Sequence, residues 1–262
     1  MPLHNILLAA ALGLGLAAPA LADEAAARGL EIAEEADRRD EGWGDSTTTL
    51  TMTLRNKQGQ ESTREMRNRS LEVADDGDKS LIIFDHPKDV RGTALLTFSH
   101  KTGNDDQWLY LPALKRTKRI ASNNKSGPFM GSEFAYEDIS SQEVEEYTYK
   151  YLRDESYEGT PVYVIERYPT DDNSGYTKQI VWMDAERYIP LKVDYYDRKQ
   201  SHLKTLTFHD YEQYKGKHWR PLRMEMQNLQ TGKSTTLAFA EYEFDQGLSE
   251  RDFDQAALAR AR

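Results

Sequence analysis

The sequence predicts a mainly β protein built on one curved, largely antiparallel sheet, with a few helices laid across its open side. Polar and apolar residues alternate with period two through most of the chain after residue 46. Short connectors rich in Gly, Asn and Asp separate these segments, which is typical of antiparallel neighbours. No strand–helix–strand rhythm is present, so a parallel sheet is excluded. The count is roughly eleven strands, with the turn spacing of a sandwich or barrel.

Residues 1–22 have the pattern of a secretory signal peptide. They contain no acidic residue, Lys or Arg, and an apolar run over residues 6–18 precedes an Ala-Leu-Ala site that ends at Ala22. A retained membrane anchor is the alternative, but the run is short for a bilayer span and contains two glycines. We therefore expect cleavage after Ala22, a periplasmic location and a single domain over residues 23–262.

Composition excludes several classes of function. The 262-residue chain has no cysteine, which removes disulfides, thiol catalysis and a lipid-modified cysteine. Its net charge of −10 argues against nucleic acid, whose phosphates require a large positive surface. We expect a monomer.

The elements follow in order from local pattern. Residues 24–40 are rich in Ala, Glu and Arg, with apolar residues spaced for one helical face, and glycines at 42 and 44 end this predicted helix. A capped turn is expected over residues 140–147, and a helix follows Ser249. The expected strands are residues 47–54, 61–73, 80–84, 93–98, 107–111, 148–152, 161–168, 176–183, 188–196, 202–211, 219–229 and 234–244.

No catalytic or metal-binding motif stands out. The six histidines form no paired spacing of the H-E-x-x-H type, and the chain has no G-x-S-x-G nucleophile motif. Glu133, Glu137 and Asp138 lie close together in sequence and would suit acid–base chemistry if one were buried. The simpler interpretation, solvent-facing or ion-paired carboxylates, is favoured. We expect no metal, no cofactor and no enzymatic activity.

Residues 105–140 depart from ordinary strand patterning in three successive pieces. Trp108 and Tyr110 alternate with leucines in one strand, either as core packing or as the wall of a cavity. A basic run follows, which is either a solvated edge or a contact for anionic head groups or an acidic partner. Its members are Lys115, Arg116, Lys118 and Arg119.

The third piece is a glycine-flanked loop over residues 127–131. Phe129 and Met130 lie between Gly127 and Gly131, so the loop is either tucked into the core or a hinged flap with an adaptable apolar tip.

These pieces resemble the signature of the outer membrane lipoprotein-sorting protein family, the LolA-like periplasmic proteins. The resemblance is close over residues 105–140 and loose over the rest of the chain. The matching motifs are Gln107-Trp108-Leu109-Tyr110-Leu111-Pro112, Lys115-Arg116-x-Lys118-Arg119-Ile120 and Phe129-Met130-Gly131-Ser132-x-Phe134-x-Tyr136-Glu137-Asp138.

The resemblance implies an incomplete, half-open antiparallel β-barrel whose concave face, covered by helices, holds acyl chains. It also implies non-enzymatic ferrying of lipid-anchored cargo toward the outer membrane. We expect the cavity to be lined by Trp108, Tyr110, Phe129, Met130, Phe134, Trp182 and Met183.

The chain is also similar to proteins found alongside exporters of the resistance-nodulation-division (RND) type. An alternative function is therefore an accessory module that binds such an exporter through the basic run and carries no lipid itself. An inner-membrane exporter and an outer-membrane acceptor are both possible partners.

Overall fold

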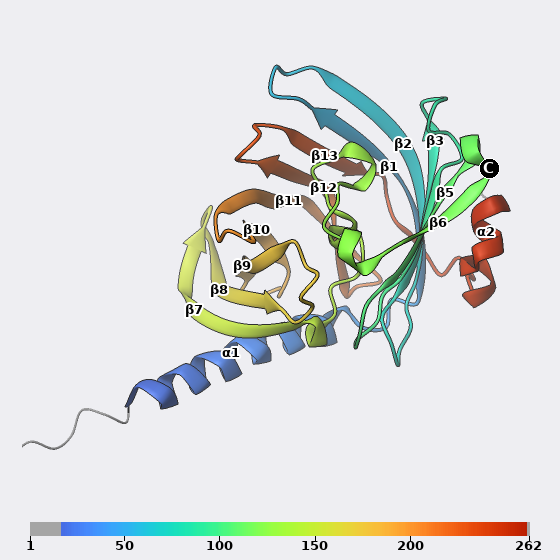
Figure 1. The fold of residues 1–262 in the computed structure, drawn as a ribbon. Coiled ribbons are helices and arrows are strands. Elements are labelled where there is room, and N and C mark those ends of the chain that lie inside the picture. The colour runs from blue at the N-terminus through green and yellow to red at the C-terminus, as the bar shows by residue number, and fades with distance from the viewer. Residues whose placement is uncertain (1–16, 261–262) are drawn as a thin grey trace, which may run out of the picture.

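One antiparallel sheet of fourteen strands forms the body of the molecule and curves into a barrel that does not close (Figure 1). The computed structural model describes residues 17–260, so residues 1–16 of the expected signal peptide lie outside the described residues. Along the sheet the order is β6-β5-β4-β3-β2-β1-β13-β12-β11-β10-β9-β8-β7, with β14 paired to β1. The strands β6 and β7 are therefore the two open edges.

The strands are β1 (Asp45–Arg55), β2 (Glu61–Leu71), β3 (Lys79–His86), β4 (Ala94–Phe98), β5 (Asp106–Leu111), β6 (Arg116–Ile120), β7 (Tyr147–Tyr157), β8 (Thr160–Pro169), β9 (Tyr176–Asp184), β10 (Pro190–Asp197), β11 (His202–Tyr214), β12 (His218–Asn228), β13 (Ser234–Phe239) and β14 (Glu243–Phe244). The predicted half-open antiparallel barrel is confirmed, with more strands than expected. One extra strand, β6, is formed by the basic run, and the expected strand over residues 234–244 is divided into β13 and β14.

Helix α1 (Ala17–Asp40) runs along the open side and packs against β7 (Figure 1). Ile32 and Ala33 are buried against the concave face of the sheet, as the predicted apolar stripe requires. Gly29 permits the close approach, because a Cβ at this position would lie 2.7 Å from the backbone nitrogen of Tyr151. The helix thus covers the lower half of the concave face.

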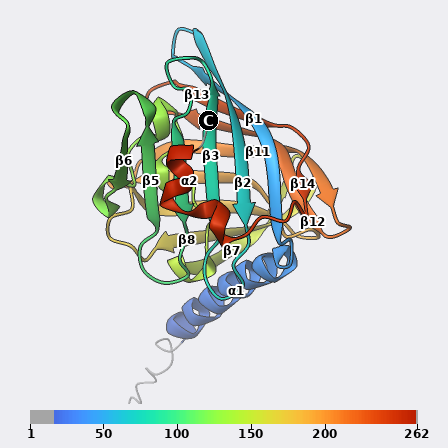
Figure 2. The same ribbon diagram turned by 90° about the vertical axis from the view of Figure 1, so that its right-hand side faces the viewer.

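Helix α2 (Gln255–Arg260) lies on the opposite, convex side, in front of β3 and β5 (Figure 2). It follows a 3₁₀ turn, η6 (Glu250–Phe253), in which the Ser249 backbone N–H donates to Asp252, as the predicted cap requires. Phe253 and Leu258 are buried among Leu81, Ile83 and other side chains of the outer face. This makes a second, smaller core.

The chain crosses the concave side between the two edge strands, over residues 121–146, which we call the crossing segment. It contains four 3₁₀ turns: η2 (Ser122–Asn124), η3 (Phe129–Gly131), η4 (Tyr136–Asp138) and η5 (Val144–Glu146). A further turn, η1 (Pro112–Leu114), joins β5 to β6. The crossing segment runs through the middle of the barrel down to α1, which lies along the lower side and contacts η5 (Figure 1).

Candidate functional site

A cavity with a volume of about 940 Å³ lies between α1 and the concave face of the sheet. Ala33 and Ala36 form its wall on the helix side, and strands β8 to β12 form the opposite wall. We call it the α1 cavity. Its apolar lining on the sheet side is Ile165, Val181, Met183, Val193, Leu206, Phe208 and Met224.

Strand register places the concave side chains in rows that run across neighbouring strands. Because paired residues of antiparallel strands share a face, one row is apolar: Ile165, Val181, Val193, Leu206 and Met226. The next row, two residues along each strand, is polar. This polar row consists of Tyr149, Arg167, Gln179, Tyr195, Lys204 and Asn228.

The crossing segment contacts the polar row through a buried ion pair. Lys204 Nζ lies 2.6 Å from Asp138 Oδ2 and also donates to the Glu133 carbonyl oxygen at 2.8 Å. The Tyr176 hydroxyl donates to the same carboxylate at 2.9 Å. The side chain of Asp138 is therefore held from two strands, β9 and β11.

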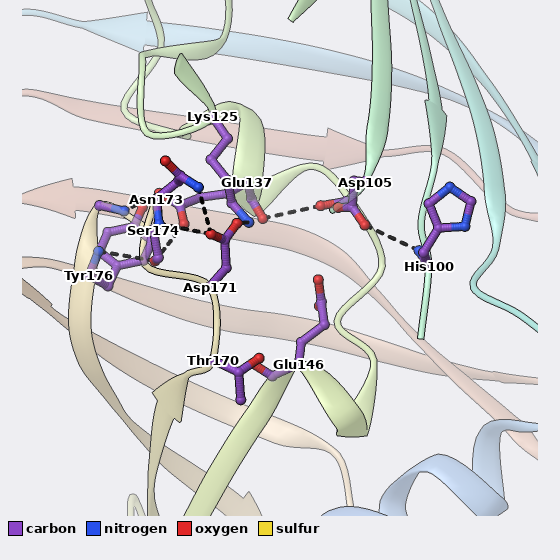
Figure 3. A network of polar contacts seen from close by, with 12 residues as sticks. His100, Asp105, Lys125, Glu137, Glu146, Thr170, Asp171, Asn173, Ser174 and Tyr176 are labelled. Carbon is purple, nitrogen blue, oxygen red and sulfur yellow. Dashed lines mark hydrogen bonds and ion pairs between the residues drawn. The ribbon is translucent and has the colours of Figure 1, made fainter. Parts of the chain in front are cut away.

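A second polar network joins the crossing segment to loops at both ends of the sheet (Figure 3). Lys125 Nζ lies 2.8 Å from Asp171, in the β8–β9 connector. Glu137 accepts hydrogen bonds from the Ser174 hydroxyl at 2.7 Å and from the Gly175 N–H at 2.9 Å. Beside β4, the Ser141 N–H donates to Ser99. The segment thus bridges the gap that the two unpaired edges leave.

Asp78 of the cavity lining and two carboxylates of the crossing segment, Glu143 and Glu146, are partly withdrawn from water. Burial raises the pKa of Asp78 to about 6 and that of Glu143 to about 7, where nearby carboxylates add to the effect. Burial, with a contribution from the charge of Asp105, raises the pKa of Glu146 to about 8. At pH 7, Glu146 is therefore mostly protonated and Glu143 about half protonated, while Asp78 is mostly ionised.

The glycine-flanked loop is tucked into the core in this conformation. Phe129 is 1% exposed and packs against the rings of Phe84 and Tyr136, at centroid distances of 5.8 and 5.7 Å. Phe134 is equally buried, and its carbonyl accepts the Phe129 N–H at 2.7 Å. Met130 packs at the margin of the same cluster. All three belong to the concave core, but none of them lines the α1 cavity.

Two of the expected cavity aromatics lie on the other side of the sheet. Trp108 and Tyr110 pack on the convex face, under α2, while Leu109 between them faces the concave core. Their alternation in β5 agrees with the sequence, but the leucines occupy the concave face. Neither aromatic side chain lines the α1 cavity.

The expected pair in β9 is divided in the same way. Met183 lines the α1 cavity, whereas Trp182 points to the opposite face and packs with Val162 and Val164. Lys192 Nζ lies 3.9 Å from the centre of the Trp182 ring and covers it. Of the seven aromatic and methionine side chains expected in the cavity, Met183 is the one that lines it.

The basic run forms the exposed edge of the sheet. Arg116, Lys118 and Arg119 lie in β6, whose outer side has no neighbouring strand among the described residues. Lys115 precedes the strand in a left-handed conformation, and Leu114 beside it is 63% exposed. Arg119 pairs with Asp106 of β5. These four residues therefore lie together at one rim, away from the α1 cavity.

The three carboxylates considered for acid–base chemistry all have structural partners. Glu133 accepts a hydrogen bond from the Asn228 amide at 2.7 Å, Glu137 holds Ser174 and Asp138 pairs with Lys204. Within residues 17–260, no group of three His, Asp or Glu residues is arranged to hold a metal ion. No helix in the described part of the chain is long and apolar enough to cross a membrane.

Sequence reasoning did not single out the polar row or the helix side of the cavity. Arg167 is one residue among many charged ones, and nothing in its neighbours marks it as inward-facing. A signal was present in the apolar positions, since Val181/Met183, Val193/Tyr195 and Leu206/Phe208 share one face by period two. Only the position of α1 shows which face encloses the cavity.

Comparisons with known proteins agree with this architecture. A family model with the description of an uncharacterized protein matches residues 76–260. No curated protein sequence matches the chain.

Solved structures are more informative. An outer membrane lipoprotein-sorting protein domain from Vibrio parahaemolyticus is 60% identical, with a TM-score of 0.88 over 90% of this chain and 100% of that one. A DUF1329 family protein from Desulfovibrio piger is 31% identical, with a TM-score of 0.84 over 89% and 99%. A LolA superfamily protein from Nitrosomonas europaea, 21% identical with a TM-score of 0.69 over 87% and 97%, shares the fold. The chain therefore belongs to the outer membrane lipoprotein-sorting protein family, whose fold is LolA-like.

Proposed function

We propose that this protein is a periplasmic carrier that binds acyl chains of a lipid or lipoprotein in the α1 cavity and ferries them toward the outer membrane. The observation that carries the proposal is the cavity itself, enclosed by the apolar row on one side and by Ala33 and Ala36 of α1 on the other. Its volume of about 940 Å³ is near the upper end of the range for small-ligand sites, about 300–1,000 Å³.

Transfer of this kind needs no covalent chemistry. Burying an acyl chain contributes about 0.8 kcal/mol per methylene, whatever head group the chain carries. Loading and release then require two conformations that differ by a few kcal/mol and that membrane partners interconvert. We propose α1 as the moving part, because its second half lines the cavity. Its first six residues, 17–22, belong to the expected export signal, so the helix of the exported form would begin at Asp23.

The exported form is proposed to begin at Asp23, after removal of residues 1–22, and to comprise a single carrier domain over residues 23–262. Amino-terminal sequencing of protein recovered from the periplasm tests this. An amino terminus at Met1, or recovery in the membrane fraction alone, would contradict it.

Native mass spectrometry of protein purified gently from periplasm tests the carrier function. The expected result is a mass increment that corresponds to bound lipid and disappears after delipidation. Protein that is always recovered empty, and that also fails to take up a fluorescent fatty acid after delipidation, would overturn the proposal.

The basic run is proposed to contact a membrane partner or anionic head groups during loading or release. The supporting observation is the exposure of Lys115, Arg116 and Lys118 on a free edge strand in a chain whose net charge is −10. This edge also supports the second candidate function, an accessory module of an RND-type exporter that carries no lipid.

Charge reversal tests the basic run as a partner contact, and the lipid content of the wild type separates the two functions. Replacing Lys115, Arg116, Lys118 and Arg119 by Glu should abolish capture of an exporter or acceptor while lipid occupancy stays unchanged. If the charge-reversed variant still captured the partner, the basic run would not be part of the interface. A wild-type protein that captures an exporter but never contains lipid would favour the accessory module over the carrier.

A further inference from the structure

Arg167 is a cavity-lining cation without a carboxylate partner. Its Nε donates to Gln179 Oε1 at 2.7 Å and its Nη2 to Gln142 Oε1 at 3.1 Å, so both hydrogen-bond partners are neutral amides. The guanidinium also lies 4.4 Å from the centre of the Tyr147 ring. Among the described residues, no carboxylate forms an ion pair with it, and no hydrogen bond from Nη1 is present.

The other basic residues of the cavity wall differ from Arg167. Arg39, Lys79, Arg187 and Arg220 are each in an ion pair with a carboxylate, and Lys217 is exposed at the rim, where it donates to a backbone carbonyl. A half-buried cation costs free energy unless a counter-charge or hydrogen bonds compensate it. Arg167 thus has positive charge and donor capacity left for a ligand.

The position of Arg167 relates this charge to the apolar wall. In β8 it lies two residues from Ile165, and of the polar row Tyr149, Arg167 and Tyr195 line the cavity beside the apolar row. A ligand with its chain along Val181, Val193 and Leu206 would have its head at the level of Arg167. The cavity is therefore amphipathic, with a cation at the polar margin.

Three carboxyl groups of the crossing segment leave this charge unpaired. Burial raises the pKa of Glu143 to about 7 and that of Glu146 to about 8, so at pH 7 Glu146 is mostly protonated and Glu143 about half protonated. Asp138, the carboxylate of the crossing segment that also lines the cavity, is bound to Lys204.

We propose that the ligand of the α1 cavity is a long-chain amphiphile with an anionic head group, and that Arg167 binds this group while the chain lies along the apolar row. The inference rests on the proposed carrier function and specifies its cargo. A guanidinium binds carboxylate and phosphate oxygens well, because its N–H groups form a planar fork. Gln142 and Gln179 hold that fork in place from the crossing segment and from β9.

The test compares ligands that share a sixteen-carbon chain and differ only in the head: hexadecanoate, hexadecyl phosphate and hexadecanol. Each displaces the neutral fluorescent probe N-phenyl-1-naphthylamine from delipidated protein at pH 7. We expect at least one anionic ligand to bind roughly tenfold or more tightly than hexadecanol, the scale of a hydrogen bond to a charged group. The carboxylate and phosphate arms distinguish a free fatty acid from a phosphate-bearing lipid.

Variants test whether the preference for anionic ligands depends on Arg167. R167Q should bind hexadecanol as the wild type does and lose the preference for anions, whereas R167K should retain part of it. The matched control is R39Q, which removes the same charge from the same cavity at a cation already paired with Glu35. Circular dichroism and thermal melting verify that each variant is folded.

Three outcomes overturn the inference, each in a different way. If the wild type bound all three ligands equally, an anionic head group would be excluded as a requirement, but the carrier function would be unaffected. If R167Q kept the preference for anionic ligands, or if R39Q lost it equally, Arg167 would not be the residue that binds the head group. Failure of every ligand, together with failure of the probe itself to bind, would overturn the carrier function as well.

Discussion

Lys204 Nζ and Asp138 Oδ2 lie 2.6 Å apart, with only 4% and 3% of their side chains exposed, and this pair fixes the crossing segment to the centre of the sheet. The lysine extends from β11 and the aspartate from η4, residues that are far apart in sequence. Three further hydrogen bonds surround the pair, from Tyr176, from the Ala135 N–H and to the Glu133 carbonyl. The crossing segment is therefore anchored by charge as well as by Phe129.

Removing one member of this pair should be costly. In K204M the carboxylate of Asp138 would remain buried without its counter-charge, and we expect a loss of about 3–5 kcal/mol in the free energy of unfolding. Urea denaturation measures this loss. The control is R28Q, which breaks an exposed pair with Glu31 and should cost less than about 1 kcal/mol. Similar losses in both variants would mean that the buried pair is not an anchor.

Phe129 should be the main apolar anchor of the same segment. Because it is 1% exposed and packed against Phe84 and Tyr136, F129A should lower the free energy of unfolding by about 3–5 kcal/mol. M130A, at the adjacent, less buried position, is the comparison and should cost clearly less. Equal and small effects in chemical denaturation would indicate a loop that is released from the core in solution.

Stability should fall as pH rises from about 5 to about 8. In the unfolded chain a Glu side chain ionises near a pKa of about 4.3, whereas in the folded protein burial holds the pKa of Glu143 at about 7 and that of Glu146 at about 8. Between these values the folded state binds more protons, so the stabilisation is complete below about pH 4 and is lost as the folded groups ionise.

At about 1.4 kcal/mol per pH unit and group, the expected decrease is several kcal/mol, measured by denaturation at a series of pH values. E146Q should flatten the profile and be more stable than the wild type at pH 8. E145Q, at the exposed neighbouring position, is the control and should keep the wild-type slope. A wild-type stability that rises over this range would contradict the assignment.

The close packing of α1 against β7 should depend on Gly29. A Cβ there would lie 2.7 Å from Tyr151 N and 2.8 Å from Lys150 N, and these backbone atoms of β7 cannot move aside. G29V should therefore lift the helix and cost about 1–3 kcal/mol, with easier access of a fluorescent probe to the cavity. A26V, on the exposed side of the same helix, introduces the same side chain without the clash and should cost less. Indistinguishable melting curves for the two variants would show that α1 is not seated as described.

Filling the α1 cavity should block ligand uptake without unfolding the protein. Ala36 lines the cavity from the helix side, so the indole of A36W would occupy volume that a chain needs. We expect at least a tenfold loss of probe affinity, with a change in stability within about 1 kcal/mol. A26W places the same side chain on the exposed face and should bind as the wild type does. Undiminished binding by A36W would place the ligand elsewhere.

The family motif and the period-two pattern were sufficient to predict the half-open antiparallel barrel, the end of α1 at Asp40 and the cap at Ser249. These features are local, since alternation, turn residues and capping side chains act within a few residues of the backbone that they shape. The position of the basic run at an edge of the sheet was also predictable, because a strand of charged residues is tolerated only where one side meets water.

The sequence did not predict which face of each strand lies on the concave side of the sheet. Alternation shows that Trp108 and Leu109, or Trp182 and Met183, point in opposite directions, but the pattern is the same whichever face is concave. The cavity was therefore expected on the aromatic side of β5, whereas α2 covers that side and α1 covers the other.

By itself, then, the sequence determined most of the strands and both helices, their order, the family and the side chains that share a face. Only the tertiary structure decided which face encloses a cavity and that Arg167, Gln142 and Gln179 meet at its margin. The physical reason is that curvature and helix docking depend on contacts between segments far apart in the chain. Apolar burial drives these contacts but has no direction of its own, so no local pattern specifies them.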